Sequence, residues 1–298
     1  MPYTANRLDV RKTDTTNLNN HIPIPETMSN IIKIDVESIV KAKAGKKARY
    51  IPKFVISYLK KIIHQDEVNV ALDNFGHKEG LDFVSAFMEY FNNSFEVHGL
   101  ENLPHDDRRY TFVSNHPLGA QDGLGLAHIL GPVYDGKIKF LANDLLMNFP
   151  QISSFWIPIN KTGKQARDLP QQVNAAFQSD NHIVMFPAGL CSRKKKGVVK
   201  DLPWKKTFIT KSIQAQRDVV PIHFEGENSE FFYRLANIGK FLGLKFNIAM
   251  LYLSDEMFKN KNKKFKVTIG KPIPWQTFDK SKSANEWAQY VQDVVYAL

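Results

Sequence analysis

The sequence of 298 residues has few or none of several common features, and each absence excludes a class of protein or of site. Its single cysteine, Cys191, excludes an intramolecular disulfide and a cysteine-rich zinc site. No segment reaches the roughly 20 apolar residues that a membrane-spanning helix needs, and the best candidate, 241–253, contains Lys245. The polar N-terminus does not resemble a signal peptide. We therefore expect a cytoplasmic protein that acts, if at a membrane, on its surface.

Acidic residues are also in the minority. The chain has 40 Lys and Arg against 30 Asp and Glu, a formal net charge of +10. This surplus favours an anionic partner, namely nucleic acid, an acidic membrane surface or an anionic substrate. The basic clusters at 41–48, 193–206 and 259–266 contain few aromatic residues and no nucleic-acid-binding motif. We therefore predict an anionic membrane surface as the partner, with nucleic acid as the weaker alternative.

The pattern along the chain divides it into three parts. Residues 1–30 lack hydrophobic periodicity, which predicts a disordered or loosely packed N-terminus. Apolar residues at helical spacing predict a helical N-terminal region over 31–92. From 93 to 298, short β-branched and aromatic runs alternate with helical patterns, which predicts an α/β fold with a mostly parallel twisted sheet flanked by helices. The expected strands are 95–99, 109–115, 137–143, 155–159, 182–187, 218–226 and 264–273.

Two of the expected helices have a pronounced apolar face. In the helical stretch at 52–64, one face carries the apolar residues Phe54, Val55, Tyr58, Leu59, Ile62 and Ile63. The segment 231–245 has an apolar face with cations beside it, formed by Phe231, Leu235, Ile238 and Leu242 with Arg234, Lys240 and Lys245. Such a helix lies either in a bilayer interface or against the sheet, and the sequence leaves both open.

The stretch SNHPLGAQDG at 114–123 places a histidine where α/β proteins hold their sites. His116 comes at the carboxyl end of an expected strand, and Gly119 permits a sharp turn. Asp122 then either orients the ring of His116 as a catalytic partner or caps the following helix. From this stretch alone both interpretations stand, and caps are the commoner of the two.

The stretch FPAGLCSRKKK at 186–196 follows a second expected strand. Arg193 is a candidate anion clamp, because a guanidinium group matches a phosphate or carboxylate with two hydrogen bonds. The three lysines at 194–196 are expected in a solvated or membrane-facing loop. Cys191 is expected to be structural rather than nucleophilic. Pro221, in a later apolar run, indicates an edge strand or a strand that lines the site.

Together, these stretches and FWIPINKTG at 155–163 resemble the glycerolipid (lysophospholipid) acyltransferase superfamily over residues 90–275, in the manner of the 1-acylglycerol-3-phosphate acyltransferases. Four ordered blocks carry the resemblance: Asn115 and His116 followed by Asp122; Asn160 and Lys161; Phe186, Pro187, Gly189, Ser192 and Arg193; and Val220 with Pro221. The resemblance implies an acyltransferase-like α/β domain over 93–298, and it makes the catalytic interpretation of His116 and Asp122 the better one.

The chain departs from the family pattern at three points. Five residues separate His116 from Asp122 where the family has four, so Gln121 occupies the usual aspartate position. Ala188 replaces the family's glutamate, and Lys161 stands where many members have arginine. These variants resemble a bacterial subgroup whose members are labelled hemolysins or are linked to the acylation of amino acids in ornithine- or glycine-type lipids.

The resemblance implies transfer of an acyl group from an acyl carrier protein or coenzyme A thioester to a hydroxyl or amine of a lipid precursor. His116 would act as the general base and Asp122 as its partner, with amides near Gly119 and Ala120 stabilising the oxyanion. The residues expected to contact substrate are Asn115, Gly119, Lys161, Phe186, Pro187, Gly189, Ser192 and Arg193. The reaction requires neither metal nor cofactor, and the expected location is the inner face of the cell membrane. A non-catalytic lipid-binding protein of the same fold remains the main alternative.

Overall fold

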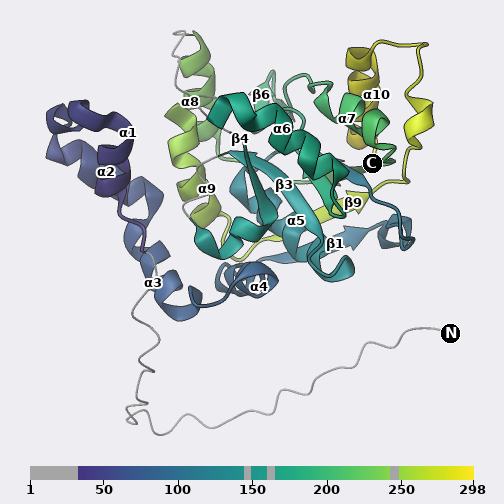
Figure 1. The fold of residues 1–298 in the computed structure, drawn as a ribbon. Coiled ribbons are helices and arrows are strands. Elements are labelled where there is room, and N and C mark those ends of the chain that lie inside the picture. Colours follow the sequence, from purple (N-terminus) through teal and green to yellow (C-terminus); the bar gives the residue numbers. More distant parts are fainter. Residues whose placement is uncertain (1–32, 144–148, 160–164, 242–247) are drawn as a thin grey trace, which may run out of the picture.

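The computed structural model describes residues 33–143, 149–159, 165–241 and 248–298 (Figure 1). The expected loose N-terminus at 1–30 lies outside these ranges. The α-helices are α1 (Val36–Ala44), α2 (Lys53–Ile63), α3 (Gln65–Phe75), α4 (Gly80–Tyr90), α5 (Ala120–Val133), α6 (Gln165–Gln178), α7 (Thr207–Ala215), α8 (Glu230–Phe241), α9 (Leu253–Lys259) and α10 (Ala284–Tyr296). The strands are β1 (Ser94–His98), β2 (Thr111–Ser114), β3 (Ile138–Asn143), β4 (Trp156–Ile159), β5 (His182–Met185), β6 (Arg193–Lys195), β7 (Val198–Lys200), β8 (Val219–Phe224) and β9 (Lys264–Ile269).

The described chain forms a seven-stranded sheet in the order β1-β9-β8-β2-β5-β3-β4. Strands β8, β2, β5, β3 and β4 run parallel to one another. β9 runs antiparallel to β8, and β1 pairs with β9 in parallel. The predicted α/β fold with a mostly parallel sheet is therefore confirmed, and all seven expected strands are present. The two strands at one edge are the ones that run the other way.

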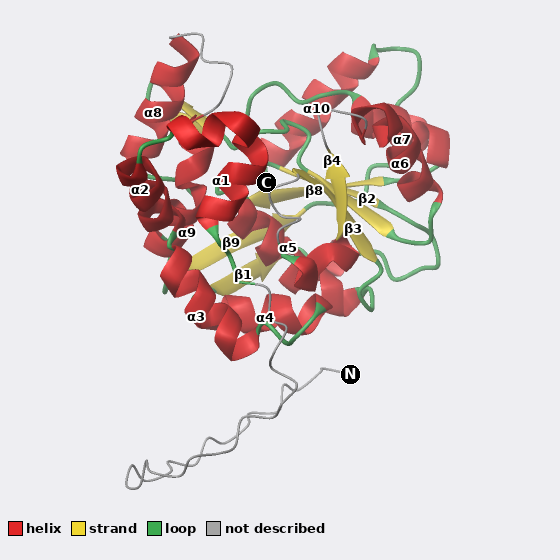
Figure 2. Ribbon diagram, turned by 60° about the vertical axis from the view of Figure 1, so that its left-hand side comes forward, coloured by secondary structure: helices red, strands yellow, loops and turns green. Residues whose placement is uncertain are grey.

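Helices cover both faces of the sheet (Figure 2), and the alternation of side chains along each strand divides the core into two layers. Phe112 and Val184 pack in the cluster that α4 and α5 cover, whereas Val113 and Ile183 pack in the cluster that α6, α7 and α10 cover. Successive residues point to opposite faces of a sheet, so one short apolar strand feeds both layers. The helices on both faces leave the carboxyl ends of the strands available for a site.

The helical N-terminal region is confirmed, and the apolar face of its second helix is only partly covered by the rest of the protein. Ile62 of α2 is buried, whereas Phe54 and Tyr58 on the same face are exposed, Phe54 to 73 %. Tyr58 reaches across to η6 (Ile248–Tyr252), where its hydroxyl lies 2.6 Å from that of Tyr252. Leu59 and Ile63 pack against the core, so one part of this apolar face is covered and the part with Phe54 and Tyr58 is exposed.

Pro221 does not mark an edge strand, because β8 lies between β2 and β9. The pairing of β8 with β9 covers Ile222 to Phe224, so the missing amide of Pro221 falls just before that pairing begins. The carbonyl of Pro221 still accepts a hydrogen bond from the amide of Gly270 at 2.8 Å. A Cβ on Gly270 would lie 2.9 Å from Pro221 Cγ. The glycine thus provides the room that lets a proline occupy an interior strand.

The basic stretch after β5 forms a hairpin rather than the expected loop. Arg193–Lys195 (β6) pairs antiparallel with Val198–Lys200 (β7). Lys196 and Gly197 both have positive φ at the turn, as tight hairpins require. The hairpin returns the chain to the end of the main sheet, where Asp201 follows it directly.

Candidate active site

Two loops meet at the carboxyl end of the sheet because the strands that precede them are parallel neighbours. β2 lies between β8 and β5, and it leads into Asn115 and His116. β5 leads into the segment 186–193. The first and third motif blocks are therefore side by side, and they lie beside the strand that carries the fourth.

Asp122 is both the partner of His116 and the cap of α5. Its Oδ1 lies 2.9 Å from Nδ1 of His116. Its Oδ2 accepts hydrogen bonds from the amides of Leu118 at 2.9 Å and Gly119 at 3.3 Å. The aspartate is fully buried, whereas the histidine side chain keeps 19 % exposure. The two interpretations of the sequence are thus compatible, because each carboxylate oxygen has its own task.

Gln121 points to other partners. Its Nε2 donates to Oδ1 of Asn93 at 2.8 Å, and its Oε1 accepts from Nδ2 of Asn260 at 3.0 Å. The buried amide therefore joins the chain before β1 to the chain after α9. The turn bends sharply at Gly119, whose φ of +88° and ψ of −124° suit only glycine.

The ring of His116 has one aromatic and several charged neighbours. Phe186 stacks on it with ring centroids 4.2 Å apart. Desolvation lowers the pKa of His116, but the charge and hydrogen bond of Asp122, with a further contribution from Asp201, outweigh it. Arg193 opposes them weakly, and the net pKa lies above the ordinary histidine value. The ring is therefore a stronger base than a free histidine.

The backbone of His116 is also held, by residues after β5. Its amide donates to Oδ1 of Asp201 at 3.2 Å, and its carbonyl accepts from the amide of Ser192 at 2.8 Å. The hydroxyl of Ser192 donates to the same Oδ1 at 2.6 Å. The predicted substrate contact of Ser192 stays a prediction, since the structure shows its side chain engaged with Asp201.

Asn115 faces the neighbouring strand. Its Nδ2 donates to the carbonyl of Phe224 at 2.9 Å, and its Oδ1 accepts from the amide of Phe224 at 2.7 Å. The side chain thus continues the pairing of β2 and β8 by one residue. This arrangement fixes the point at which His116 leaves the sheet, and a substrate contact of Asn115 remains untested.

The Phe-Pro-Ala-Gly stretch is a tight turn. The amide of Gly189 donates to the carbonyl of Phe186 at 2.9 Å, and Gly189 has a φ of +67°. The carbonyl of Pro187 accepts from the amide of Lys205 at 3.1 Å. Ala188 is buried in the second core layer. The turn therefore shapes the loop that carries the Phe186 ring to His116.

Arg193 and Cys191 complete this loop. Nη1 of Arg193 donates to the carbonyls of Cys191 at 2.5 Å and Ser192 at 3.2 Å, which holds the guanidinium beside the site. The thiol of Cys191 lies near Gly119, where a Cβ would be 3.3 Å from Sγ. Burial raises the pKa of Cys191 well above its usual range. The thiol is therefore a poor nucleophile, as the sequence suggested.

Lys161 and Asn160, the second motif block, lie outside the described residues. Within the described ranges, no group of three or more His, Cys, Asp or Glu side chains is placed to hold a metal ion. The amide of Gly119 is engaged with Asp122, so the expected oxyanion donors reduce to Ala120. That role stays a prediction.

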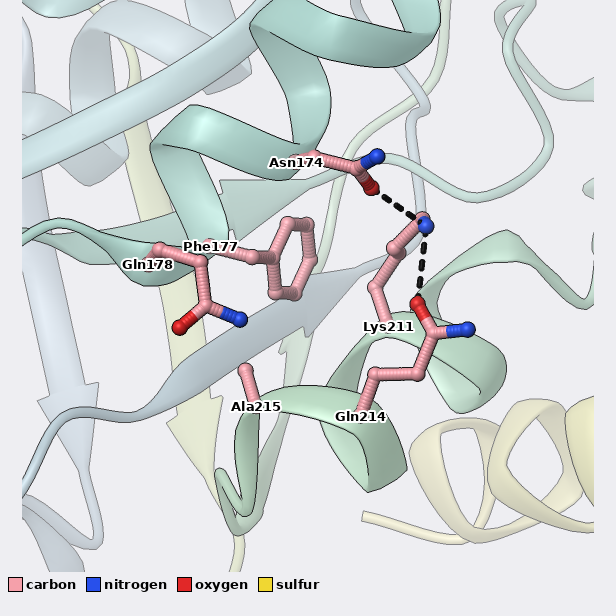
Figure 3. Close-up of a pocket in the computed structure, with 6 residues that line it drawn as sticks. All are labelled: Asn174, Phe177, Gln178, Lys211, Gln214 and Ala215. Atoms are coloured by element: carbon pink, nitrogen blue, oxygen red, sulfur yellow. Dashed lines mark hydrogen bonds between the residues drawn. The ribbon is translucent and has the colours of Figure 1, made fainter.

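A surface pocket of about 350 Å³ lies away from these loops, between α6 and α7. Figure 3 shows its lining residues, Asn174, Phe177, Gln178, Lys211, Gln214 and Ala215. Lys211 donates hydrogen bonds to Asn174 and Gln214. The charge of the lining is thus already satisfied by amide oxygens, and none of these residues suits acyl transfer.

Sequence reasoning missed Asp201. The signal was present, because Asp201 is the lone carboxylate among seven cations over 193–206. An isolated acid in a basic stretch is a candidate for a specific contact.

Comparisons with known proteins identify the family of this chain. A family model described as acyltransferase matches residues 38–298. A lyso-glycine lipid O-acyltransferase of Bacteroides thetaiotaomicron is 62 % identical over 272 residues, which cover 91 % of this chain and 100 % of that protein. A protein of the same name from Phocaeicola vulgatus is also 62 % identical over 272 residues, with 91 % and 97 % covered. The crystal structure of the 1-acyl-sn-glycerophosphate acyltransferase PlsC from Thermotoga maritima aligns with 19 % identity and a TM-score of 0.44, over 87 % of this chain and 85 % of that one. The chain belongs to the acyltransferase family and is a lipid acyltransferase.

Proposed function

We propose that this lipid acyltransferase transfers an acyl group from a thioester to a hydroxyl of a lyso-glycine lipid, with His116 as the general base. The His116–Asp122 hydrogen bond of 2.9 Å is the observation that carries the mechanism. The acceptor follows from the two relatives that are 62 % identical and are named for O-acylation of a lyso-glycine lipid. Transfer to an amine was the other possibility in the sequence, and these names favour oxygen.

The proposed step uses the free nitrogen of the ring. Nδ1 of His116 faces Asp122, which leaves Nε2 to take the proton of the acceptor hydroxyl. The acceptor oxygen then forms a bond to the thioester carbonyl carbon. The C–S bond breaks, and the thiolate of coenzyme A or acyl carrier protein leaves with the proton from Nε2. Asp122 stabilises the imidazolium that exists between the two proton transfers.

Binding of an anionic group is assigned to Arg193. Its guanidinium is partly buried, is fixed by two carbonyls, and contributes to the electrostatics of His116. It therefore lies close enough to hold a carboxylate or phosphate of either substrate near the base.

Membrane association is proposed for the surface where α2, η6 and α8 meet. Tyr252 links Tyr58, through their hydroxyls, to Phe231, whose ring centroid lies 5.1 Å from its own. Phe54 and Ile238 are also exposed. Lys53, Lys61 and Arg234 on the same helices are exposed cations. Exposed aromatics beside cations suit the interface of an anionic bilayer. None of the helices in the described ranges has the length and hydropathy to cross a membrane.

The reaction is tested with purified protein, an acyl carrier protein or coenzyme A thioester, and three acceptors: a lyso-glycine lipid, lysophosphatidic acid and free glycine. We expect thiol release only with the lyso-glycine lipid, and a product whose new acyl group is removed by mild alkali, as an ester is. The rate of the variant His116→Ala should be roughly 10⁴-fold lower than that of the wild type, while the protein stays folded. Faster transfer to lysophosphatidic acid than to the lyso-glycine lipid would contradict the proposed acceptor. Near-normal turnover by His116→Ala would contradict the proposed mechanism.

The membrane surface is tested separately by co-sedimentation with liposomes. Phe54→Ser combined with Phe231→Ser should weaken binding to anionic vesicles, because both side chains are exposed. Leu100→Ser provides a matched control, since Leu100 is an exposed apolar residue just after β1, away from α2, η6 and α8. Equal binding to neutral and anionic vesicles, or equal binding by the double variant, would count against this surface.

A further inference from the structure

We propose that Asp201 is a positioning residue for His116, a second carboxylate that fixes the backbone of the general base and sustains its basicity. This inference rests on the proposed role of His116. Asp201 lies outside the four motif blocks and 85 residues along the chain from His116.

The contacts of Asp201 are those of an ionised carboxylate. It is only 8 % exposed, and its two oxygens accept three hydrogen bonds. Oδ1 accepts from the hydroxyl of Ser192 at 2.6 Å and from the amide of His116 at 3.2 Å. Oδ2 accepts from Nε1 of Trp204 at 2.9 Å. All three partners are donors, so each hydrogen bond favours the charged form.

This carboxylate is anchored to the fold independently of His116. Its own amide donates to the hydroxyl of Tyr296 at 2.7 Å, at the end of α10. Trp204 packs in the core layer beneath α7 and α10. Asp201 therefore connects the rigid second layer of the protein to the point where the catalytic loop leaves β2.

His116 is consequently held on three sides. Asp122 contacts Nδ1 and Phe186 stacks on the ring. Asp201 and Ser192 hold the backbone amide and carbonyl. A histidine that turns or shifts by about 1 Å loses its alignment with the acceptor, and such misplacement costs up to roughly 100-fold in rate. The contact to the amide is therefore a catalytic support as well as a structural one.

The charge of Asp201 adds to that of Asp122. The charged and titratable groups that face His116 are Asp122 on α5, Asp201 after β7 and Arg193 on β6, with the thiol of Cys191 beside them. The two carboxylates raise the pKa of His116 and the guanidinium lowers it. Burial raises the net pKa of Asp201 above the ordinary aspartate value, although its three donors and the charge of His116 lower it. Loss of this charge should thus weaken the base while the Asp122 contact remains.

The experiment measures the pKa of His116 by NMR in histidine-labelled protein, with the His116→Ala spectrum as the assignment, and measures kcat and KM on the same samples. Asp201→Asn removes the charge but also sets an amide group against the indole N–H of Trp204. Trp204→Phe removes that N–H and leaves the charge. The double variant Asp201→Asn/Trp204→Phe therefore lacks the charge without the clash of donors.

We expect the pKa of His116 to fall in Asp201→Asn and in the double variant, and to stay at the wild-type value in Trp204→Phe. We expect kcat to fall roughly 10- to 100-fold in both Asp201 variants with KM little changed. An unchanged pKa of His116 in folded Asp201→Asn, or recovery of kcat in the double variant, would overturn the proposal. If His116→Ala is active, the proposed base role fails, but the titration still reports whether Asp201 acts on His116.

Discussion

The turn after β2 and the segment after β5 both hold His116, and they hold different parts of it. The turn supplies Asp122, which contacts the ring nitrogen from six positions away in sequence. The segment 186–201 supplies Phe186 against the ring face and Ser192 and Asp201 against the backbone, from 70 to 85 positions away. The protonation state of the base is thus set mainly by a local contact, and its position mainly by distant ones.

The sharpest test of this comparison is Asp122→Asn, in the turn. The introduced amide would keep an oxygen for the Leu118 and Gly119 amides and turn its nitrogen to Nδ1 of His116. Nδ1 must then accept, so the neutral ring carries its proton on Nε2 and no longer acts as a base. We expect a rate loss of roughly 10³- to 10⁴-fold in steady-state kinetics.

The pH profile of the same variant has a defined direction. Only the neutral form of His116 is a base, so the rate falls as the pH drops through its pKa. Asp122 raises that pKa, and its loss should therefore move the acidic limb to lower pH while the plateau falls. Gln121→Ala is the matched control. The acidic limb of its pH–rate profile should stay at the wild-type position, because Gln121 contacts Asn93 and Asn260 rather than His116. A larger rate loss in Gln121→Ala than in Asp122→Asn would show that the wrong residue is paired.

Gly119→Ala tests the shape of the turn without changing a charge. Its Cβ would meet the Leu253 methyl groups at 3.1 Å and the sulfur of Cys191 at 3.3 Å, at a φ of +88°. We expect the free energy of unfolding to fall by about 1–3 kcal/mol, measured in urea, with a loss of activity because Asp122 moves. The control Gly45→Ala separates the effect of backbone strain from that of steric crowding around the added Cβ. Gly45 has similar backbone angles, a φ of 53° and a ψ of −131°, with no atom near its Cβ position. A normal rate in Gly119→Ala would mean that the turn tolerates displacement.

The fold and the turn could largely be predicted from sequence because both depend on local patterns. The apolar strands and the capped turn around Gly119 are short-range features. The interior position of Pro221 depends on Gly270 across the sheet, and sequence spacing carries no sign of that contact. Likewise, the exposure of Phe54 depends on where α2 ends up relative to the sheet. Both features arise from partners distant in sequence.

The same distinction between local and distant contacts applies to the residues of the site. The pairing of His116 with Asp122 follows from their spacing and from the family resemblance. The hydrogen bonds of Ser192 and Asp201 to the backbone of His116 follow from the return of the β6–β7 hairpin, which the sequence suggested to be a loop. A basic run predicts solvation for its lysines, and it gives no information on which carboxylate within it is buried.

The smallest effect on kcat is expected for Ser192→Ala, in the segment 186–201. The substitution removes one donor to Oδ1 of Asp201 but keeps the amide of residue 192 that donates to the carbonyl of His116. A hydrogen bond to a charged group contributes about 1.5–3 kcal/mol, so thermal and urea unfolding should show a loss in that range. Because Asp201 retains two donors, we expect kcat to fall by only a few-fold, less than in Asp201→Asn. The acidic limb of the pH–rate profile, which the pKa of His116 sets, should stay at its wild-type position. An increase in KM without loss of stability would instead assign the Ser192 hydroxyl to the substrate, and would transfer this residue from the support of His116 to the binding site.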